Sequence, residues 1–108
     1  MSADEKLIDA ANTYKERNKI YGNNYLNFGP TMVGMFPDGL ELKTPDDFIR
    51  FHLLMLDVVK TTRYCNNFAD GGHADSIHDK VVYCAMLEHH DEVVREKKEK
   101  KQIEDMVR

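Results

Sequence analysis

The strongest helix signal in the chain lies at residues 44–64, which read TPDDFIRFHLLMLDVVKTTRY. Thr44 places a hydroxyl group at the N-cap, and Pro45 fits the first helical position. The two aspartates that follow lie at the positive end of the helix dipole. Apolar residues occupy most of the circumference beyond them, which is typical of a helix packed on several sides. This stretch therefore predicts a long central helix that ends near Tyr64.

A second long helix is expected downstream of the turn-forming residues 66–72, which contain two asparagines and two glycines. It begins near residues 75–76, runs to about Val94 and continues into residues 95–108. That C-terminal segment is rich in helix formers and holds six basic and four acidic residues, a net charge of +2. We expect one domain over residues 1–94, followed by a charged helical or flexible tail over 95–108.

Two further helices are expected upstream of the central helix. The first spans residues 3–20 and begins with a capping box formed by Ser2 and Glu5. The second spans residues 30–36, with Pro30 at its first helical position. Since no segment alternates between apolar and polar residues with a period of two, the predicted fold is all-α, a bundle of about four helices.

The composition narrows the class of protein. The 108 residues include 15 basic and 19 acidic ones, a net charge of −4, which argues against nucleic acid as a partner. The chain has no run of eighteen apolar residues and no apolar N-terminal segment, so we expect neither a membrane span nor a signal peptide. Two cysteines, Cys65 and Cys84, are too few for a disulfide framework, which favours a cytoplasmic protein. So short a chain often completes its core by forming a homo-oligomer.

Three charged residues interrupt the apolar surface of the central helix. Asp57, Lys60 and Arg63 are spaced by three, so their side chains lie on adjacent parts of the helix surface. Lysine and arginine on one face are suited to binding phosphate, because the arginine side chain donates to two oxygens at once. The alternative is an ion pair within the helix, between Asp57 and Lys60, with Arg63 exposed.

Two carboxylates and a tyrosine share one face of the last helix. Asp75, Asp79 and Tyr83 are spaced by four, so both carboxylates lie one turn apart and repel each other. A divalent cation such as Mg²⁺ would relieve this repulsion, and so would Lys60 and Arg63 from a facing helix. The alternative is that Asp75 serves as the N-cap and Asp79 is an ordinary surface residue.

The segment at residues 21–28 is polar and aromatic, and it is expected as a loop between the first two helices. Asparagine amides such as that of Asn24 bind base edges or phosphate oxygens, and tyrosines such as Tyr21 stack on bases. The alternative is a helix-terminating turn in which the asparagines act as caps.

These pieces together resemble a known family. The order is a Y-G-x-x-x-x-N-F stretch from Tyr21 to Phe28, a K-x-x-R pair at Lys60 and Arg63, and a D-x-x-x-D-x-x-x-Y series at residues 75–83. This set, over residues 10–92, resembles the small phage and bacterial nucleotide-modification-associated proteins. Those proteins are similar to the MazG-like, all-α nucleoside triphosphate pyrophosphohydrolases.

The resemblance implies a helical core that assembles as a homodimer or homotetramer in the cytoplasm, that of the host cell if a phage encodes it. It implies Mg²⁺ and cleavage between the α- and β-phosphates of a nucleoside triphosphate. It also implies a nucleotide pocket that includes Asp75 and Asp79, and the expected nucleotide-binding residues are Tyr21, Gly22, Asn24, Asn27, Lys60, Arg63 and Tyr83. If the chain is an enzyme, the expected metal ligands are Asp57, Asp75 and Asp79, with Asp57 and Asp79 as catalytic residues.

The chain departs from the hydrolytic relatives at their metal site. Those enzymes carry an E-x-x-E helix and an E-x-x-D helix, and the core of this chain has no E-x-x-E. Two functions therefore stand side by side. One is Mg²⁺-dependent hydrolysis. The other is binding without turnover, either to sequester a host signalling (cyclic) nucleotide as an anti-defence sponge or to assist phage nucleotide modification.

Overall fold

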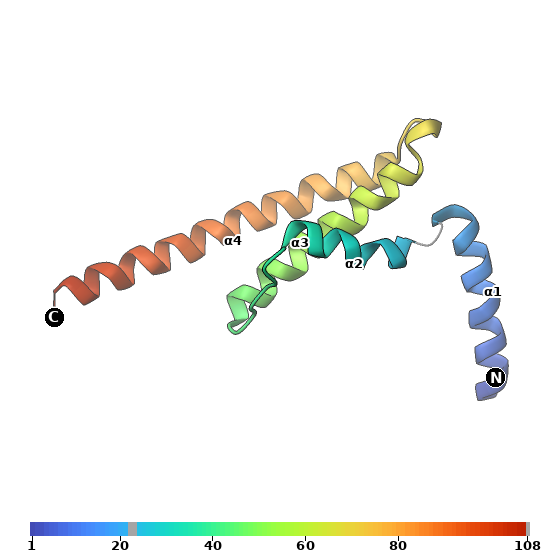
Figure 1. The fold of residues 1–108 in the computed structure, drawn as a ribbon, viewed down its shortest axis with the longest axis horizontal. Coiled ribbons are helices and arrows are strands. Elements are labelled where there is room, and N and C mark those ends of the chain that lie inside the picture. Colours follow the sequence, from blue (N-terminus) through green and yellow to red (C-terminus); the bar gives the residue numbers. More distant parts are fainter. Residues whose placement is uncertain (22–23, 108) are drawn as a thin grey trace. The chain divides into compact units, whose positions relative to one another are not determined.

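The structure, a computed structural model, describes residues 1–21 and 24–107. Within these residues it contains four α-helices, one short 3-10 helix and no strand, so the predicted all-α fold is confirmed. The chain divides into two compact units, Met1–Leu40 and Glu41–Arg108. The first unit holds α1 and α2, and the second holds α3 and α4 (Figure 1). No helix of the described residues is long and apolar enough to cross a membrane.

The helix α1 (Ala3–Tyr21) begins with the predicted capping box. The backbone amide of Glu5 donates to Ser2 Oγ, and the amide of Ser2 donates to Glu5 Oε2, both at 3.4 Å. Each side chain thereby satisfies one of the amides that have no partner within the first helical turn.

The helix α2 (Asn24–Met35) starts six residues earlier than predicted. Pro30 lies inside this helix and not at its first position, so the expected loop at residues 24–28 is wrong. The proline rule identified a helix start, but helix-compatible apolar residues also precede Pro30. The proline has no N–H to donate to the carbonyl of Leu26. One turn is also held by Thr31, whose hydroxyl donates to the carbonyl of Asn27 at 2.7 Å.

The helix α3 (Pro45–Asn66) begins as predicted, with Thr44 as its N-cap and Pro45 in its first turn. Asp47 completes a capping box: its amide donates to Thr44 Oγ1 at 3.1 Å, and its carboxylate accepts from the Thr44 amide at 3.0 Å. Its carboxylate also accepts from the amide of Lys43. These backbone bonds, first that from Lys43, hold the pKa of Asp47 below its ordinary value.

A compact turn joins α3 to α4. Asn67 organises it: its side-chain amide donates to the Arg63 carbonyl at 2.8 Å, and its own carbonyl accepts from the amide of Gly72 at 2.7 Å. A 3-10 helix (Phe68–Asp70) and Gly71 in the left-handed conformation lie between these contacts. The sequence predicts this turn correctly from its asparagines and glycines.

The helix α4 (Ala74–Met106) begins one residue before the predicted start and is capped by His73. The possibility that Asp75 is the N-cap is therefore wrong. The ring of His73 accepts from the amide of Ser76 at 3.3 Å, which is the bond that an aspartate would otherwise make. The helix continues without a break through residues 95–106, so most of the charged tail is helical.

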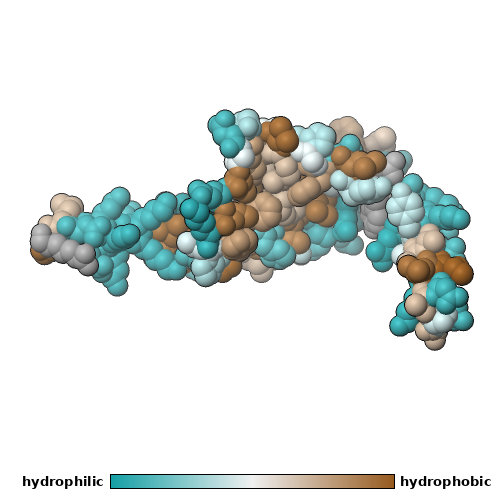
Figure 2. Space-filling view, turned by 60° about the horizontal axis from the view of Figure 1, so that its bottom comes forward, coloured by the Kyte–Doolittle hydropathy of each residue, from teal (hydrophilic) through white to brown (hydrophobic). Residues whose placement is uncertain are grey.

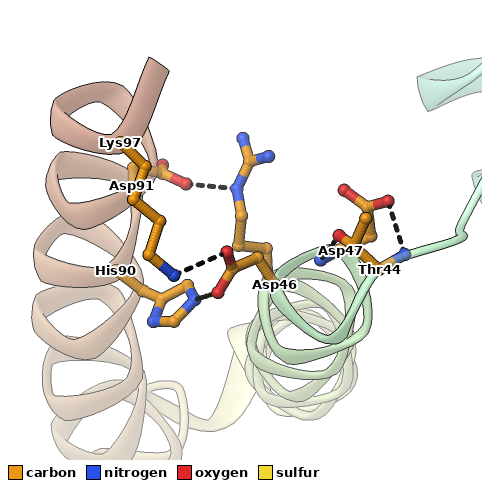
Figure 3. Close-up of polar contacts among 7 residues, drawn as sticks. Thr44, Asp46, Asp47, His90, Asp91 and Lys97 are labelled. Carbon is orange, nitrogen blue, oxygen red and sulfur yellow. Dashed lines mark hydrogen bonds and ion pairs between the residues drawn. The ribbon is translucent and has the colours of Figure 1, made fainter. Parts of the chain in front are cut away.

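The two long helices run antiparallel and pack against each other along α3 and the first two thirds of α4 (Figure 1). Ion pairs close the far end of this hairpin. Asp46 accepts from His90 Nε2 at 2.9 Å and from Lys97 Nζ at 3.0 Å, while Arg50 Nε lies 2.6 Å from Asp91 Oδ1. Figure 3 shows the Asp46 carboxylate between the side chains of His90 and Lys97.

The expected packing of α3 on several sides is not found among the described residues. None of their apolar side chains is buried, and the buried residues among them are two polar ones, Asp57 and Ser76. Leu53, Leu54 and Leu56 are half-buried. Hydrophobic residues remain visible on the surface in Figure 2, while the C-terminal part of α4 is largely hydrophilic. The described chain therefore leaves unburied much of the apolar surface that its helices carry.

The Asp46 contacts predict an acid-sensitive hairpin. Hydrogen bonds from Lys97 and then His90 hold the pKa of Asp46 below its ordinary value of 3.8. The stabilisation is complete above pH 3.8 and is lost as the pH falls through the lowered pKa. We expect Asp46→Asn to flatten the fall of the denaturation midpoint below about pH 4. Asp105→Asn, on an exposed part of α4, should leave that fall unchanged. Identical acid limbs in the two variants would contradict the assignment.

Candidate functional site

An ion pair joins the C-terminal half of α3 to the N-terminal part of α4. Lys60 Nζ lies 3.0 Å from Asp79 Oδ2, and the two side chains are 15% and 42% exposed. The largely buried Lys60 side chain is therefore matched by a carboxylate side chain that water still reaches. The sequence expectation that cationic groups of one helix face acidic groups of the other holds for this pair. Lys60 takes a partner across the hairpin and not Asp57 on its own helix.

The other predicted members of the site have different environments. Arg63 is half-buried one turn after Lys60, and Tyr83 is half-buried one turn after Asp79. Asp75 is exposed in the first turn of α4. A second cation, a second carboxylate and a phenol thus lie within one helical turn along the chain from the Lys60–Asp79 pair.

Asp57 occupies an unusual position for a carboxylate. It is only 6% exposed, and its Oδ2 accepts from Cys84 Sγ at 3.3 Å. Burial, and after it the bond to Asp57, raises the pKa of the Cys84 thiol. The second oxygen, Oδ1, is buried and has no hydrogen-bond partner among the described residues. A buried carboxylate oxygen without a donor is costly, so the environment of Asp57 is incomplete.

The contact between Ser76 and His73 was not predicted from the sequence. Ser76 is fully buried, and its hydroxyl lies 2.5 Å from the Nδ1 atom of His73. Its small side chain fits a position that is fully buried, and its hydroxyl has a hydrogen-bond partner in His73, the N-cap of α4. The signal was present in the sequence, since Ser76 lies three residues after His73, but histidine is not among the preferred N-cap residues.

Four of the predicted nucleotide-binding residues, Tyr21, Gly22, Asn24 and Asn27, belong to the first unit. Gly22 and the side chains of Tyr21 and Asn24 lie outside the described residues. Asn27 is exposed on α2, and its backbone carbonyl accepts from Thr31. Their roles at the site stay predictions.

The predicted metal ligands do not form a three-carboxylate group. Over residues 1–21 and 24–107, no set of three or more histidine, cysteine or acidic side chains lies close enough to hold a metal ion. Asp57 accepts a hydrogen bond from Cys84, Asp79 forms an ion pair with Lys60, and Asp75 is exposed. Mg²⁺ in nucleotide sites is commonly held by one or two carboxylates together with phosphate oxygens, so a smaller protein donor set is compatible with this ion.

The orphaned oxygen of Asp57 leads to a stability prediction. Asp57→Asn keeps the size of the side chain and an oxygen that can accept from the Cys84 thiol. It removes a buried negative charge, one oxygen of which has no donor. We expect the free energy of unfolding to rise by about 1–2 kcal/mol, measured by urea denaturation. Asp79→Asn is the matched comparison: it leaves Lys60 without a carboxylate and should lower that free energy. A loss of stability in Asp57→Asn would show that the carboxylate stabilises the fold.

Comparison with protein-family models, with curated proteins and with solved structures finds no match to this chain.

Proposed function

We propose that the α3–α4 hairpin binds the phosphate groups of a nucleotide through Lys60 and Arg63. The observation that carries this proposal is the Lys60–Asp79 pair, in which a lysine that is only 15% exposed meets a carboxylate that is 42% exposed. A partly desolvated ammonium group interacts more strongly with an anion than a free surface lysine does. Arg63 adds a second cation on the same helix, one whose planar side chain suits two phosphate oxygens.

Asp79 is the group that a bound phosphate would displace from Lys60. It neutralises Lys60 in the ligand-free chain, so the ammonium group is not left without a counter-charge. A triphosphate carries several negative charges and competes for the same ammonium group. When phosphate contacts Lys60, the carboxylate of Asp79 is released for another cation.

The proposal includes Mg²⁺ as the cation that would take up Asp79. Asp79 is partly exposed and Asp75 lies one turn earlier, so these two carboxylates would hold Mg²⁺ together with phosphate oxygens. Asp57 has an oxygen without a donor, but among the described residues it does not form a three-residue metal group with them. Mg²⁺ bound there would polarise a phosphate oxygen and lower the pKa of an attacking water molecule. Asp57 and Asp79 would then be catalytic residues of a pyrophosphohydrolase. In that reaction water attacks Pα, the bond from Pα to the oxygen that bridges the α- and β-phosphates breaks, and a nucleoside monophosphate and pyrophosphate are released.

The same phosphate contacts serve a protein that binds without turnover. In that alternative the chain sequesters a host signalling (cyclic) nucleotide, or assists a phage nucleotide-modification reaction. Tyr21, Gly22, Asn24, Asn27 and Tyr83 remain the proposed contacts to the rest of the nucleotide in either case. A nucleotide ligand also accords with a cytoplasmic location, and the unburied apolar surface supports self-association as a homodimer or homotetramer.

Calorimetric titration separates these possibilities. The full chain is titrated with ATP, GTP and a cyclic dinucleotide, with and without Mg²⁺, and each mixture is then tested for pyrophosphate. Released pyrophosphate that disappears in Asp79→Asn supports the enzyme. Saturable binding with intact nucleotide recovered supports sequestration. If none of the nucleotides binds in either condition, the proposed function is wrong.

A further inference from the structure

One flank of α4 carries an apolar strip that includes none of the ion-paired residues described above. The strip surrounds a shallow hollow of about 410 Å³, lined by Ile77, Lys80, Val81, Cys84, Ala85 and Glu88. These positions recur at intervals of three and four, so they lie on one face of the helix. Val81 is 65% exposed and Ile77 is 41% exposed, so the apolar part of the strip faces water in the single chain.

This strip lies beside the face of α4 that packs on α3, and Cys84 in the strip also donates to Asp57 of α3. The α3-facing positions include Ser76, Tyr83 and Leu87, which are buried or half-buried. At 100° per residue, the strip is centred about a third of a turn away from that seam. Covering the strip therefore does not require the hairpin to open.

The charges of the strip are arranged symmetrically. Lys80 lies four residues before Cys84, and Glu88 lies four residues after it. If two such helices cross antiparallel with a two-fold axis at Cys84, each Lys80 faces Glu88 of the second copy. The strip is thus complementary to itself in charge, with apolar side chains between the two pairs.

We propose that a second copy of this chain covers the strip, with α4 packed antiparallel on α4 of the second copy about an axis near Cys84. This names the surface for the self-association proposed above and is independent of nucleotide binding. The second copy is the occupant that the observations favour, because both members of each ion pair come from the same sequence. The described residues bury no apolar side chain fully, so covering Ile77 and Val81 adds apolar burial that the single chain lacks.

Charge reversal tests the pairing. Sedimentation velocity or light scattering gives the dimer dissociation constant of the full chain. Lys80→Glu and Glu88→Lys each place like charges opposite each other twice, and each should weaken the dimer about a hundredfold. The double variant restores opposite charges and should recover most of the affinity. Lys98→Glu, in the exposed part of α4, is the matched control and should leave the dissociation constant unchanged.

Cysteine cross-linking tests the axis. Helices packed 8–10 Å apart leave about 3.5–5.5 Å between facing Cα atoms, within reach of a disulfide. We expect Cys65→Ser to form a covalent dimer through Cys84 under mild oxidation at alkaline pH. Cys84→Ser, which keeps the exposed Cys65, should not form one.

The outcomes separate the surface from the other proposals. A dimer that ignores both charge reversals, or that cross-links only through Cys65, would place the interface elsewhere while leaving self-association intact. A chain that stays monomeric at high concentration would overturn both self-association and this surface. Neither result bears on nucleotide binding, which is read from the titrations. Circular dichroism of each variant confirms that the helices are retained.

Discussion

Replacing Gly72 with alanine is expected to lower the free energy of unfolding by about 2–5 kcal/mol. Gly72 has a φ of +82°, which alanine adopts only at a cost. Its new Cβ atom would also lie 2.5 Å from Cε2 of Tyr64. That ring packs edge-to-face on Phe68 with 6.1 Å between the ring centroids, so a shift of Tyr64 would disturb this contact.

Gly71 provides the matched control for this substitution. It also has a positive φ, of +96°, but a Cβ atom there meets nothing within 4 Å. Gly71→Ala should therefore show the backbone cost alone, about 1–2 kcal/mol. The difference between the two variants, measured by urea denaturation, isolates the collision with Tyr64. Equal losses would mean that the turn relaxes away from the ring and that the close approach of Gly72 is not a constraint.

Local chemistry explains which parts of the fold the sequence could predict. The start of α3 follows from Thr44, Pro45 and Asp47, since a capping box requires only residues three apart. The turn after α3 follows in the same way from its asparagines and glycines. Pro30 shows the limit of this reasoning, because a proline is favoured at a helix start but is not confined to it.

Contacts between the helices required information that local patterns do not contain. Asp57 and Cys84 are 27 residues apart, and Asp46 and Lys97 are 51 apart. Which of these side chains meet depends on the register of α3 against α4, which the length of the intervening turn sets. For this reason the sequence did not place Cys84 beside Asp57.

The candidate site was predictable in part. The motif order placed a cation of α3 near a carboxylate of α4, and Lys60 and Asp79 do meet at 3.0 Å. A common cluster of Asp57, Asp75 and Asp79 is not found among the described residues, because Asp57 lies on α3 and accepts from Cys84, whereas Asp79 on α4 pairs with Lys60. Asp57 is 6% exposed, whereas Asp75 is exposed. The burial of an apolar face is likewise a property of its partner, so the sequence of α3 indicated packing without specifying what covers it.

Replacing Arg63 with alanine is expected to weaken nucleotide binding about tenfold to a hundredfold, equivalent to about 1.5–3 kcal/mol. The reason is the loss of a charge-assisted contact to phosphate, which the proposed function assigns to the guanidinium group. Lys60→Ala would remove the partner of Asp79, so its effect on binding would include a change in the hairpin. The measurement is a calorimetric titration with ATP, repeated at two salt concentrations, and the difference between variants should narrow at high salt.

Two further variants decide whether the guanidinium group binds phosphate or only supports the hairpin. Arg63→Lys keeps the charge but lacks the planar fork, so it should recover part of the affinity and not all of it. Lys98→Ala removes a charge from an exposed part of α4 and should leave the affinity unchanged. Thermal unfolding of the same samples reports any structural loss. An Arg63→Ala chain that unfolds at a lower temperature yet binds ATP with unchanged affinity would assign Arg63 to the fold and remove it from the site.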